Sequence, residues 1–307
     1  MPANAPTDTA LFLDRADADA VPRTLGEINE WQHDIFKRGY APEALNAGAL
    51  RRRLIAALNI EFLVDGLDER PLTVTTVAAT RSGDGETREL IFSDPFVGDF
   101  RALLVAPVPA RRKSPAIIAL HGHFDAPETF FDQFFGKRLV AEGIAVLVLS
   151  SRALGGAPHE PETVLRFLHR GFHVLGLHVY ETLLAHKYLS FLSLLPNGPV
   201  DAEAIGLLGH SSGSTTANIA LRLLRGKIRA YAGDQITEYL GVYPVSAANE
   251  NSVFVTQAPP LFPYSRAVND FSTAGADVLM LPYGFRDGDL SYENEVVSFF
   301  ASKLTGR

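Results

Sequence analysis

The sequence contains no cysteine, and none of its nine histidines lies after His210. Without cysteine the chain can form no disulfide, and it offers neither a thiolate nucleophile nor a cysteine-ligated metal site. No apolar run approaches the roughly 18 residues that a membrane-spanning helix needs. These absences favour a protein that neither spans a membrane nor depends on disulfides.

Positive charge is also scarce. The formal net charge of −7 argues against a nucleic-acid surface, because phosphate binding requires a basic face. The two compact basic runs, residues 51–53 and 111–113, are interpreted as solvated surface. Residues 1–14 lack the basic segment followed by a long apolar segment that a secretory signal requires. We therefore expect a cytoplasmic, soluble protein that binds no nucleic acid and no membrane.

The composition is that of a packed globular chain, with 47% hydrophobic and 21% charged residues over 307 positions. This length suits one large α/β domain. We expect a flexible N-terminus at 1–24, a helical N-terminal extension packed on the core at 25–70, and an α/β domain at 71–307. The sequence makes no prediction of oligomeric state.

Strand and helix patterns alternate after residue 71. Apolar or alternating runs predict strands at 72–80, 89–92, 100–108, 116–120, 144–149, 204–209, 228–232 and 278–281. Helical periodicity predicts helices at 130–142, 175–195, 212–224 and 291–304. The helix at 175–195 places Leu177, Leu184, Tyr188, Phe191 and Leu195 on one inward stripe. This alternation predicts a mostly parallel sheet with helices on both faces.

The most specific motif is Gly209-His-Ser-Ser-Gly213, a Gly-x-Ser-x-Gly between an apolar strand and an amphipathic helix. This context predicts a nucleophile elbow with Ser211 at its apex, although an ordinary strand–turn–helix has the same outline. One oxyanion-hole N–H would come from Ser212. The other would come from the loop after His121-Gly122, where His123 contributes its backbone.

Several features together resemble the α/β-hydrolase superfamily, and within it the dienelactone-hydrolase and acetyl-xylan-esterase-like group. They are Trp31-Gln32 and the helix at 51–58, Ala119-Leu-His-Gly122, Ser151-Arg-Ala-Leu-Gly-Gly156, the helix before Val200-Asp201, and Gly209-His-Ser-Ser-Gly213. The resemblance covers roughly residues 26–240. It implies hydrolysis of carboxylic esters or related acyl compounds through an acyl-serine, without a cofactor.

The resemblance also implies a catalytic acid and a histidine after the serine. Tyr283-Gly-Phe-Arg-Asp287 fits the acid pattern, so Asp287 is the first candidate, and Asp289, Asp234 and Glu238 are alternatives. Asp287 and Asp289 could instead be turn and helix-cap residues. Such hydrolases follow the chain order Ser, acid, His. No histidine follows Ser211 in this sequence, so the expected histidine position is empty. A substitute base would have to come from upstream, with His123 and His173 as the leading candidates.

A metal-dependent chemistry is the less favoured alternative. His121-Gly-His123-Phe-Asp125 matches the start of a metallo-β-lactamase-like ligand set, but Ala126 stands where that pattern has a further histidine. We therefore predict no metal site.

The sequence thus favours a serine hydrolase with Ser211 as nucleophile, His123 and Asp287 as candidate catalytic partners, and a small-molecule ester or acyl substrate. Two alternatives remain open. One is a catalytically degenerate hydrolase that serves as a ligand-binding or scaffolding protein. The other is a lyase or cyclase that uses the oxyanion hole.

Overall fold

The computed structural model describes residues 45–83, 85–108, 113–122, 125–152, 169, 171, 173–196, 198–234, 264–281 and 290–306. The strands are β1 (Thr73–Ser82), β2 (Gly85–Asp94), β3 (Gly98–Pro107), β4 (Ser114–Leu120), β5 (Ala145–Leu149), β6 (Val200–Gly209), β7 (Ala230–Gly233) and β8 (Asp277–Met280). The helices are α3 (Ala47–Ala57), α4 (Glu61–Val64), α5 (Pro127–Gln133), α6 (Gly136–Ala141), α8 (Val174–Leu194), α9 (Ser212–Leu223), α11 (Ser265–Val268), the 3₁₀ turn η4 (Phe271–Thr273) and α12 (Leu290–Thr305).

The eight described strands form one mixed sheet in the order β1-β2-β3-β5-β4-β6-β7-β8. Strands β1, β2 and β3 are antiparallel neighbours, and β3 pairs antiparallel with β5. The remaining five strands, from β5 to β8, are parallel. The predicted mostly parallel sheet in an α/β fold is therefore confirmed.

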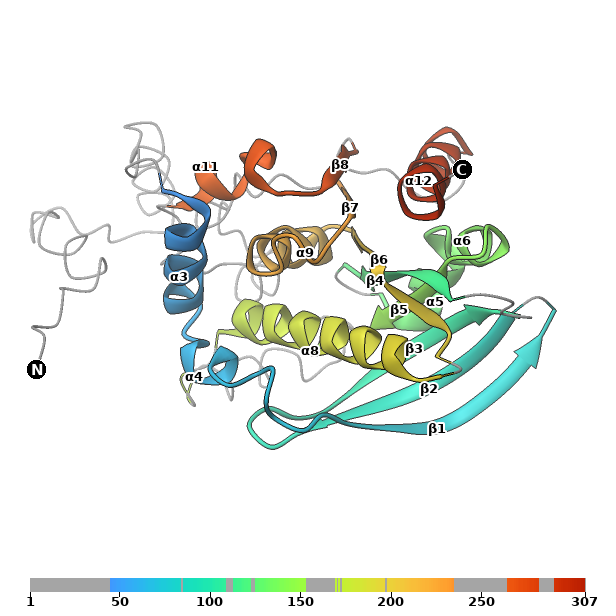
Figure 1. The fold of residues 1–307 in the computed structure, drawn as a ribbon, viewed down its shortest axis with the longest axis horizontal. Coiled ribbons are helices and arrows are strands. Elements are labelled where there is room, and N and C mark those ends of the chain that lie inside the picture. Colours follow the sequence, from blue (N-terminus) through green and yellow to red (C-terminus); the bar gives the residue numbers. More distant parts are fainter. Residues whose placement is uncertain are drawn as a thin grey trace, which may run out of the picture.

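Helices cover both faces of this sheet (Figure 1). Helices α3, α8, α9 and α11 lie on one face, and α5, α6 and α12 lie on the other. Along β4 the side chains alternate between them: Ile118 and Leu120 point to the first face, and Ile117 and Ala119 to the second. A strand buried on both faces needs apolar residues at every position, which is why β4 is a continuous apolar run.

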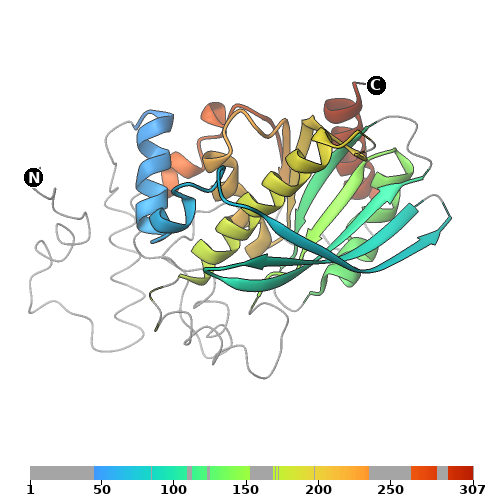
Figure 2. The same ribbon diagram turned by 60° about the horizontal axis from the view of Figure 1, so that its bottom comes forward.

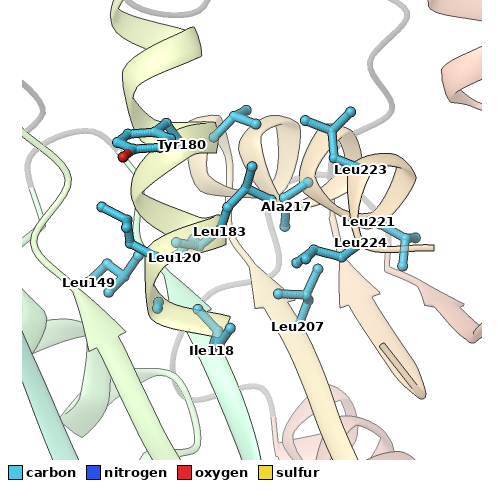
Figure 3. Close-up of a cluster of buried hydrophobic side chains, with 14 of the residues drawn as sticks. Ile118, Leu120, Leu149, Tyr180, Leu183, Leu207, Ala217, Leu221, Leu223 and Leu224 are labelled. Atoms are coloured by element: carbon cyan, nitrogen blue, oxygen red, sulfur yellow. The ribbon is translucent and has the colours of Figure 1, made fainter. Parts of the chain in front are cut away.

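The larger core lies between the sheet and helices α8 and α9 (Figure 3). Ile118 and Leu207 from the sheet meet Leu183 of α8 and Ala217 of α9 in this layer. Each fully buried leucine or isoleucine stabilises the fold by about 1.5–3 kcal/mol relative to its exposed state. This packing fixes α9 against the ends of β4 and β6, where the Gly-x-Ser-x-Gly motif lies.

Helix α8 is buried along most of its length. It lies across one face of the sheet, and β1–β3 curve beneath it (Figure 2). The ring of Tyr188 meets Phe92 of β2 edge-on, with centroids 5.3 Å apart. The predicted inward stripe is wrong at its C-terminal end, because Phe191 is 54% exposed and Leu195 39% exposed.

The single helix predicted at 130–142 is also wrong, because the chain forms two helices there. Phe135 has a φ of +71°, which ends α5 and redirects the chain into α6. A side chain on Gly136 would overlap the ring and carbonyl of Phe131, so the tight turn requires glycine at this position. Apolar periodicity continues through the turn, and the sequence pattern therefore gave no sign of the break.

Helices α3 and α4 represent the described part of the predicted N-terminal extension. Leu50, Leu54 and Leu58 are buried in the larger core, and the Arg51 guanidinium donates to the carbonyl of Leu223 in α9 at 3.3 Å. Residues 1–44 lie outside the described residues, so the division at 24 and at 70 remains a prediction. Within the described part of the chain, no helix is long and apolar enough to cross a membrane.

Candidate active site

Ser211 occupies the turn between β6 and α9 with a strained backbone. Its φ and ψ are 52° and −122°, and it is one of three described non-glycine residues with positive φ, beside Asn59 and Phe135. Such a conformation costs on the order of 1–3 kcal/mol and persists only where the surrounding structure imposes it. The geometry is that of a nucleophile elbow, which presents the serine at the carboxyl edge of the sheet.

The two glycines of the motif are required by close packing. A Cβ atom on Gly213 would overlap the carbonyl of Leu120 at the end of β4. A Cβ atom on Gly209 would lie 2.5 Å from the Cα of Ser214. The elbow therefore fits only because its strand and its helix approach at positions without side chains.

The first turn of α9 begins directly after Ser211. The amides of Gly213, Ser214 and Thr215 donate to the carbonyls of His210 or Ser211 at 2.8–3.2 Å. The amide of Ser212 has no acceptor within the part of the chain that the structure describes. An amide at a helix N-terminus without an internal acceptor is suited to bind an anion.

The loop after β4 packs against the elbow. A methyl group on Gly122 would lie 3.1 Å from both the Cβ of Ser211 and the Cδ2 of His210. The buried ring of His121 holds this loop: its Nε2 accepts from the amide of Ser151 at 3.0 Å, and its Nδ1 donates to the carbonyl of Gly122 at 2.8 Å. His121 therefore links the loops that follow β4 and β5.

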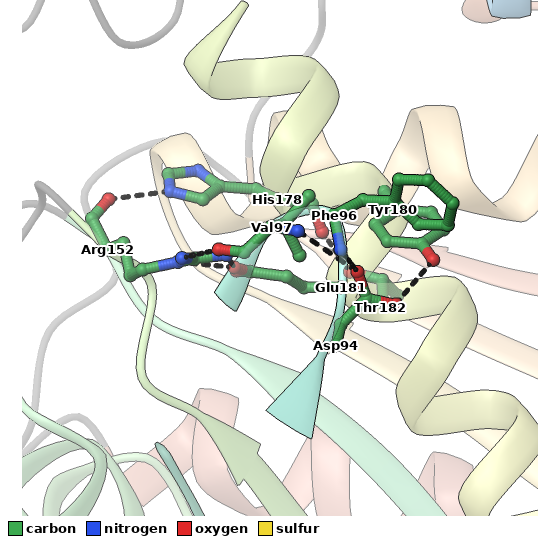
Figure 4. A network of polar contacts seen from close by, with 8 residues as sticks. All are labelled: Asp94, Phe96, Val97, Arg152, His178, Tyr180, Glu181 and Thr182. Atoms are coloured by element: carbon green, nitrogen blue, oxygen red, sulfur yellow. Dashed lines mark hydrogen bonds and ion pairs between the residues drawn. The ribbon is translucent and has the colours of Figure 1, made fainter. Parts of the chain in front are cut away.

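Arg152, the residue after Ser151, forms a buried ion pair with Glu181 (Figure 4). Its guanidinium donates to the carboxylate of Glu181 at 2.6 Å and to the carbonyl of Val97 at 2.6 Å. The Nε2 of His178 donates to the Arg152 carbonyl at 2.6 Å. Burial raises the pKa of Glu181 to about 7, although the charge of Arg152 opposes this shift.

In the same network, Tyr180 donates to the carboxylate of Asp94 at 2.8 Å (Figure 4). Asp94 also accepts from the amides of Phe96 and Val97 at 2.9 and 3.0 Å. These contacts tie α8 and the β2–β3 turn to the loop that His121 anchors.

Asp234 brings a carboxylate to the elbow. It follows β7 and is 2% exposed. Its Oδ1 accepts from the amide of Ser211 at 2.8 Å, and its Oδ2 lies 2.6 Å from the Nδ1 of His210. The sequence named Asp234 only as an alternative acid and gave His210 no role. The strand register explains the meeting, because Gly209 and Gly233 are paired at the ends of β6 and β7.

The structure describes only some of the site residues that the sequence predicted. Ser211 and Ser212 lie together at the elbow. His123, Glu238, Asp287 and Asp289 lie outside the described residues, so their roles remain predictions. No group of three or more His, Asp or Glu side chains suited to a metal occurs among the described residues. Both ring nitrogens of His121, the first residue of the metallo-β-lactamase-like pattern, contact backbone groups.

Two further upstream histidines, His173 and His186, lie at the start of α8 and within it. Burial lowers the pKa of His173, the residue before α8. His186 lies further along α8 and lines a cavity of about 790 Å³ with Lys227 and Asp277, near the amino ends of the parallel strands. Burial and the charge of Lys227 lower the pKa of His186 to about 4. This cavity is at the opposite edge of the sheet from Ser211.

Comparison with known proteins identifies the fold. No protein-family model matches the chain, and no curated protein matches it in sequence. A candidate acetyl xylan esterase from Bacteroides fragilis NCTC 9343 matches with a TM-score of 0.57 at 13% identity, over 96% of this chain and 78% of the other. An acetyl xylan esterase from Paenibacillus sp. R4 matches with a TM-score of 0.54 at 13% identity, over 92% and 100%. A glucuronoyl esterase from Solibacter usitatus matches with a TM-score of 0.51 at 14% identity, over 78% and 76%.

The chain therefore has the α/β-hydrolase fold, and acetyl xylan esterases are among its structural neighbours. At identities this low the similarity establishes the fold, and activity has to be argued from the site.

Proposed function

We propose that this protein is a serine hydrolase that cleaves a small carboxylic ester, with Ser211 as the nucleophile. The observation that carries the proposal is the strained backbone of Ser211 between two glycines that admit no side chain. A backbone held in such a state is a feature of functional sites. The solved structures that share the fold are named as esterases, which favours an ester substrate.

The proposed reaction begins with attack of the Ser211 hydroxyl on the ester carbonyl carbon. The resulting oxyanion would accept a hydrogen bond from the amide of Ser212 at the start of α9, with a second donor predicted from His123. Removal of one such donor typically slows a hydrolase about 10²–10³-fold. Release of the alcohol leaves an acyl-serine, which water then hydrolyses.

The test is covalent labelling with a fluorophosphonate probe, read by intact mass. We expect one adduct on the wild-type protein and none on Ser211→Ala. Ser190→Ala is the matched control, because Ser190 is on α8 at the opposite edge of the sheet and should not affect labelling. Circular dichroism would establish that each variant is folded.

A folded wild-type protein that remains unlabelled, under conditions where a control esterase reacts fully, would contradict the proposal. It would favour the alternative of a degenerate hydrolase that binds ligands without turnover. Labelling that persists in Ser211→Ala would show that another residue is the nucleophile.

A further inference from the structure

A serine nucleophile needs a base, and no histidine follows Ser211 within these 307 residues. The residue immediately before the serine, His210, is instead paired with a buried carboxylate. This juxtaposition of His210, Asp234 and Ser211 bears on the proposed reaction, and it is the starting point of the inference.

The pairing of His210 and Asp234 is built by the sheet. Leu120, Gly209 and Gly233 are aligned across the adjacent parallel strands β4, β6 and β7. The residues that follow β6 and β7 are His210 and Asp234, so the two side chains leave neighbouring strand ends side by side. The ring of His210 also packs on Phe134, with centroids 4.6 Å apart, and this contact restricts its orientation.

The contact with Asp234 sets the chemistry of the imidazole. A carboxylate can only accept, so the Nδ1 of His210 carries the hydrogen that spans the 2.6 Å to Asp234. In the neutral ring the lone pair is then on Nε2. In Ser-His-Asp hydrolases the acid likewise accepts from Nδ1 and holds the imidazole in this tautomer.

The ring edge that carries Nε2 lies near Ser211. The position of a methyl group on Gly122 would be 3.1 Å from both His210 Cδ2 and Ser211 Cβ, so these atoms are at most twice that distance apart. Cδ2 is bonded to Nε2, and the serine hydroxyl is bonded to Cβ. A general base can act directly or through one bridging water, so these neighbouring side chains are placed to exchange a proton.

Other described histidines are less suited to the role. His121 contacts backbone groups through both ring nitrogens, and His178 donates its Nε2 hydrogen to the carbonyl of Arg152. His186 lines the cavity at the opposite edge of the sheet. His210, in contrast, directly precedes Ser211 in the chain and pairs with the buried carboxylate of Asp234.

We propose that His210 is the general base for Ser211 and that Asp234 is the acid that orients it, an inference that rests on the proposed ester hydrolase function. As the Ser211 oxygen bonds to the carbonyl carbon, its proton passes to His210 Nε2, directly or through one water. Cleavage of the ester C–O bond returns this proton to the departing alcohol. In the second half, water adds to the acyl-serine, His210 takes a proton from that water, and Ser211 regains it as the acid leaves.

The experiment compares fluorophosphonate labelling rates of His210→Asn and His210→Ala with that of the wild type. An asparagine amide can donate to Asp234 as Nδ1 does, so His210→Asn preserves the link to the carboxylate while removing the base. We expect its labelling to slow by about 10²–10⁴-fold, the usual contribution of a general base. Imidazole added to His210→Ala should restore part of the rate, and it should restore none in Ser211→Ala.

His186→Gln is the matched control and should label at the wild-type rate. Wild-type labelling by His210→Asn would overturn the assignment of His210 while leaving Ser211 as nucleophile. Slow labelling of His210→Asn without imidazole rescue of His210→Ala would also overturn it, because a purely structural role gives that result. Absence of labelling in the wild type would instead reject the proposed function itself.

Discussion

The carboxylate of Asp234 accepts a hydrogen bond from the backbone amide of Ser211 at 2.8 Å. This contact joins the strained residue of the elbow to the end of the next strand, β7. The amide is one of the groups that a helix N-terminus leaves without an intrahelical partner, and a negative charge there is favourable. Asp234 thus stabilises the conformation of Ser211 as well as contacting His210.

The strain at Ser211 predicts a stability difference between two variants of this residue. Glycine populates positive φ without steric cost, whereas alanine retains the strain of serine. We expect the free energy of unfolding of Ser211→Gly to exceed that of Ser211→Ala by about 1 kcal/mol. Urea denaturation measures it, and equal stabilities would show that the backbone is relaxed in solution.

Close packing at the elbow predicts a strong effect of one methyl group. Gly213→Ala would force the new Cβ into the carbonyl of Leu120, and we expect a loss of about 2–3 kcal/mol or more in unfolding free energy. Gly48→Ala in α3 is the control, because its nearest contact would be an ordinary 3.5 Å. That variant should be neutral or stabilised by up to about 1 kcal/mol. A Gly213→Ala protein as stable as the wild type would contradict the close approach of α9 to β4.

The environment of His186 predicts a dependence of stability on pH. Its pKa is about 4 in the folded protein against an ordinary 6.5, so the unfolded chain binds more protons between these values. Stability from this group is therefore complete above pH 6.5 and is lost as the pH falls toward 4. Relative to His186→Gln, the wild type should lose about 2 kcal/mol between about pH 6.5 and 5. Denaturant titrations at several pH values measure the difference, and parallel curves for the two proteins would refute it.

The buried pair of Arg152 and Glu181 predicts strong coupling between its two members. Arg152→Met or Glu181→Leu alone removes the partner of the remaining buried group, which typically costs about 3–5 kcal/mol. The double variant should lose clearly less than the two losses combined. A double-mutant cycle in urea measures the coupling, and additive losses would mean that the pair contributes nothing as a unit.

The sequence predicted the sheet well because its strands are locally encoded. The strand predicted at 144–149 is β5 (Ala145–Leu149), and the one predicted at 116–120 is β4 (Ser114–Leu120). Both are buried on two faces, which leaves an apolar run that can be read without the fold. The strand at 89–92 was underestimated, because β2 (Gly85–Asp94) is extended by pairing with both of its neighbours.

Only the local geometry of the candidate site could be predicted from the sequence. The elbow at Ser211 follows from a five-residue motif between a strand and a helix. The meeting of His210 and Asp234 depends on the register of β6 against β7, which no local pattern specifies. Knowing that both residues directly follow parallel strands would have indicated it. The turn at Phe135 was missed because it depends on the packing of Gly136 against Phe131.

The described part of the site is attached to the ends of three adjacent parallel strands, β4, β6 and β7. Its geometry is therefore set by the pairing of these strands. Catalytic geometry and substrate preference become separable properties in such an arrangement. Under the proposed function, changes in the residues that follow the strand ends would alter which ester is accepted while the elbow stays as it is.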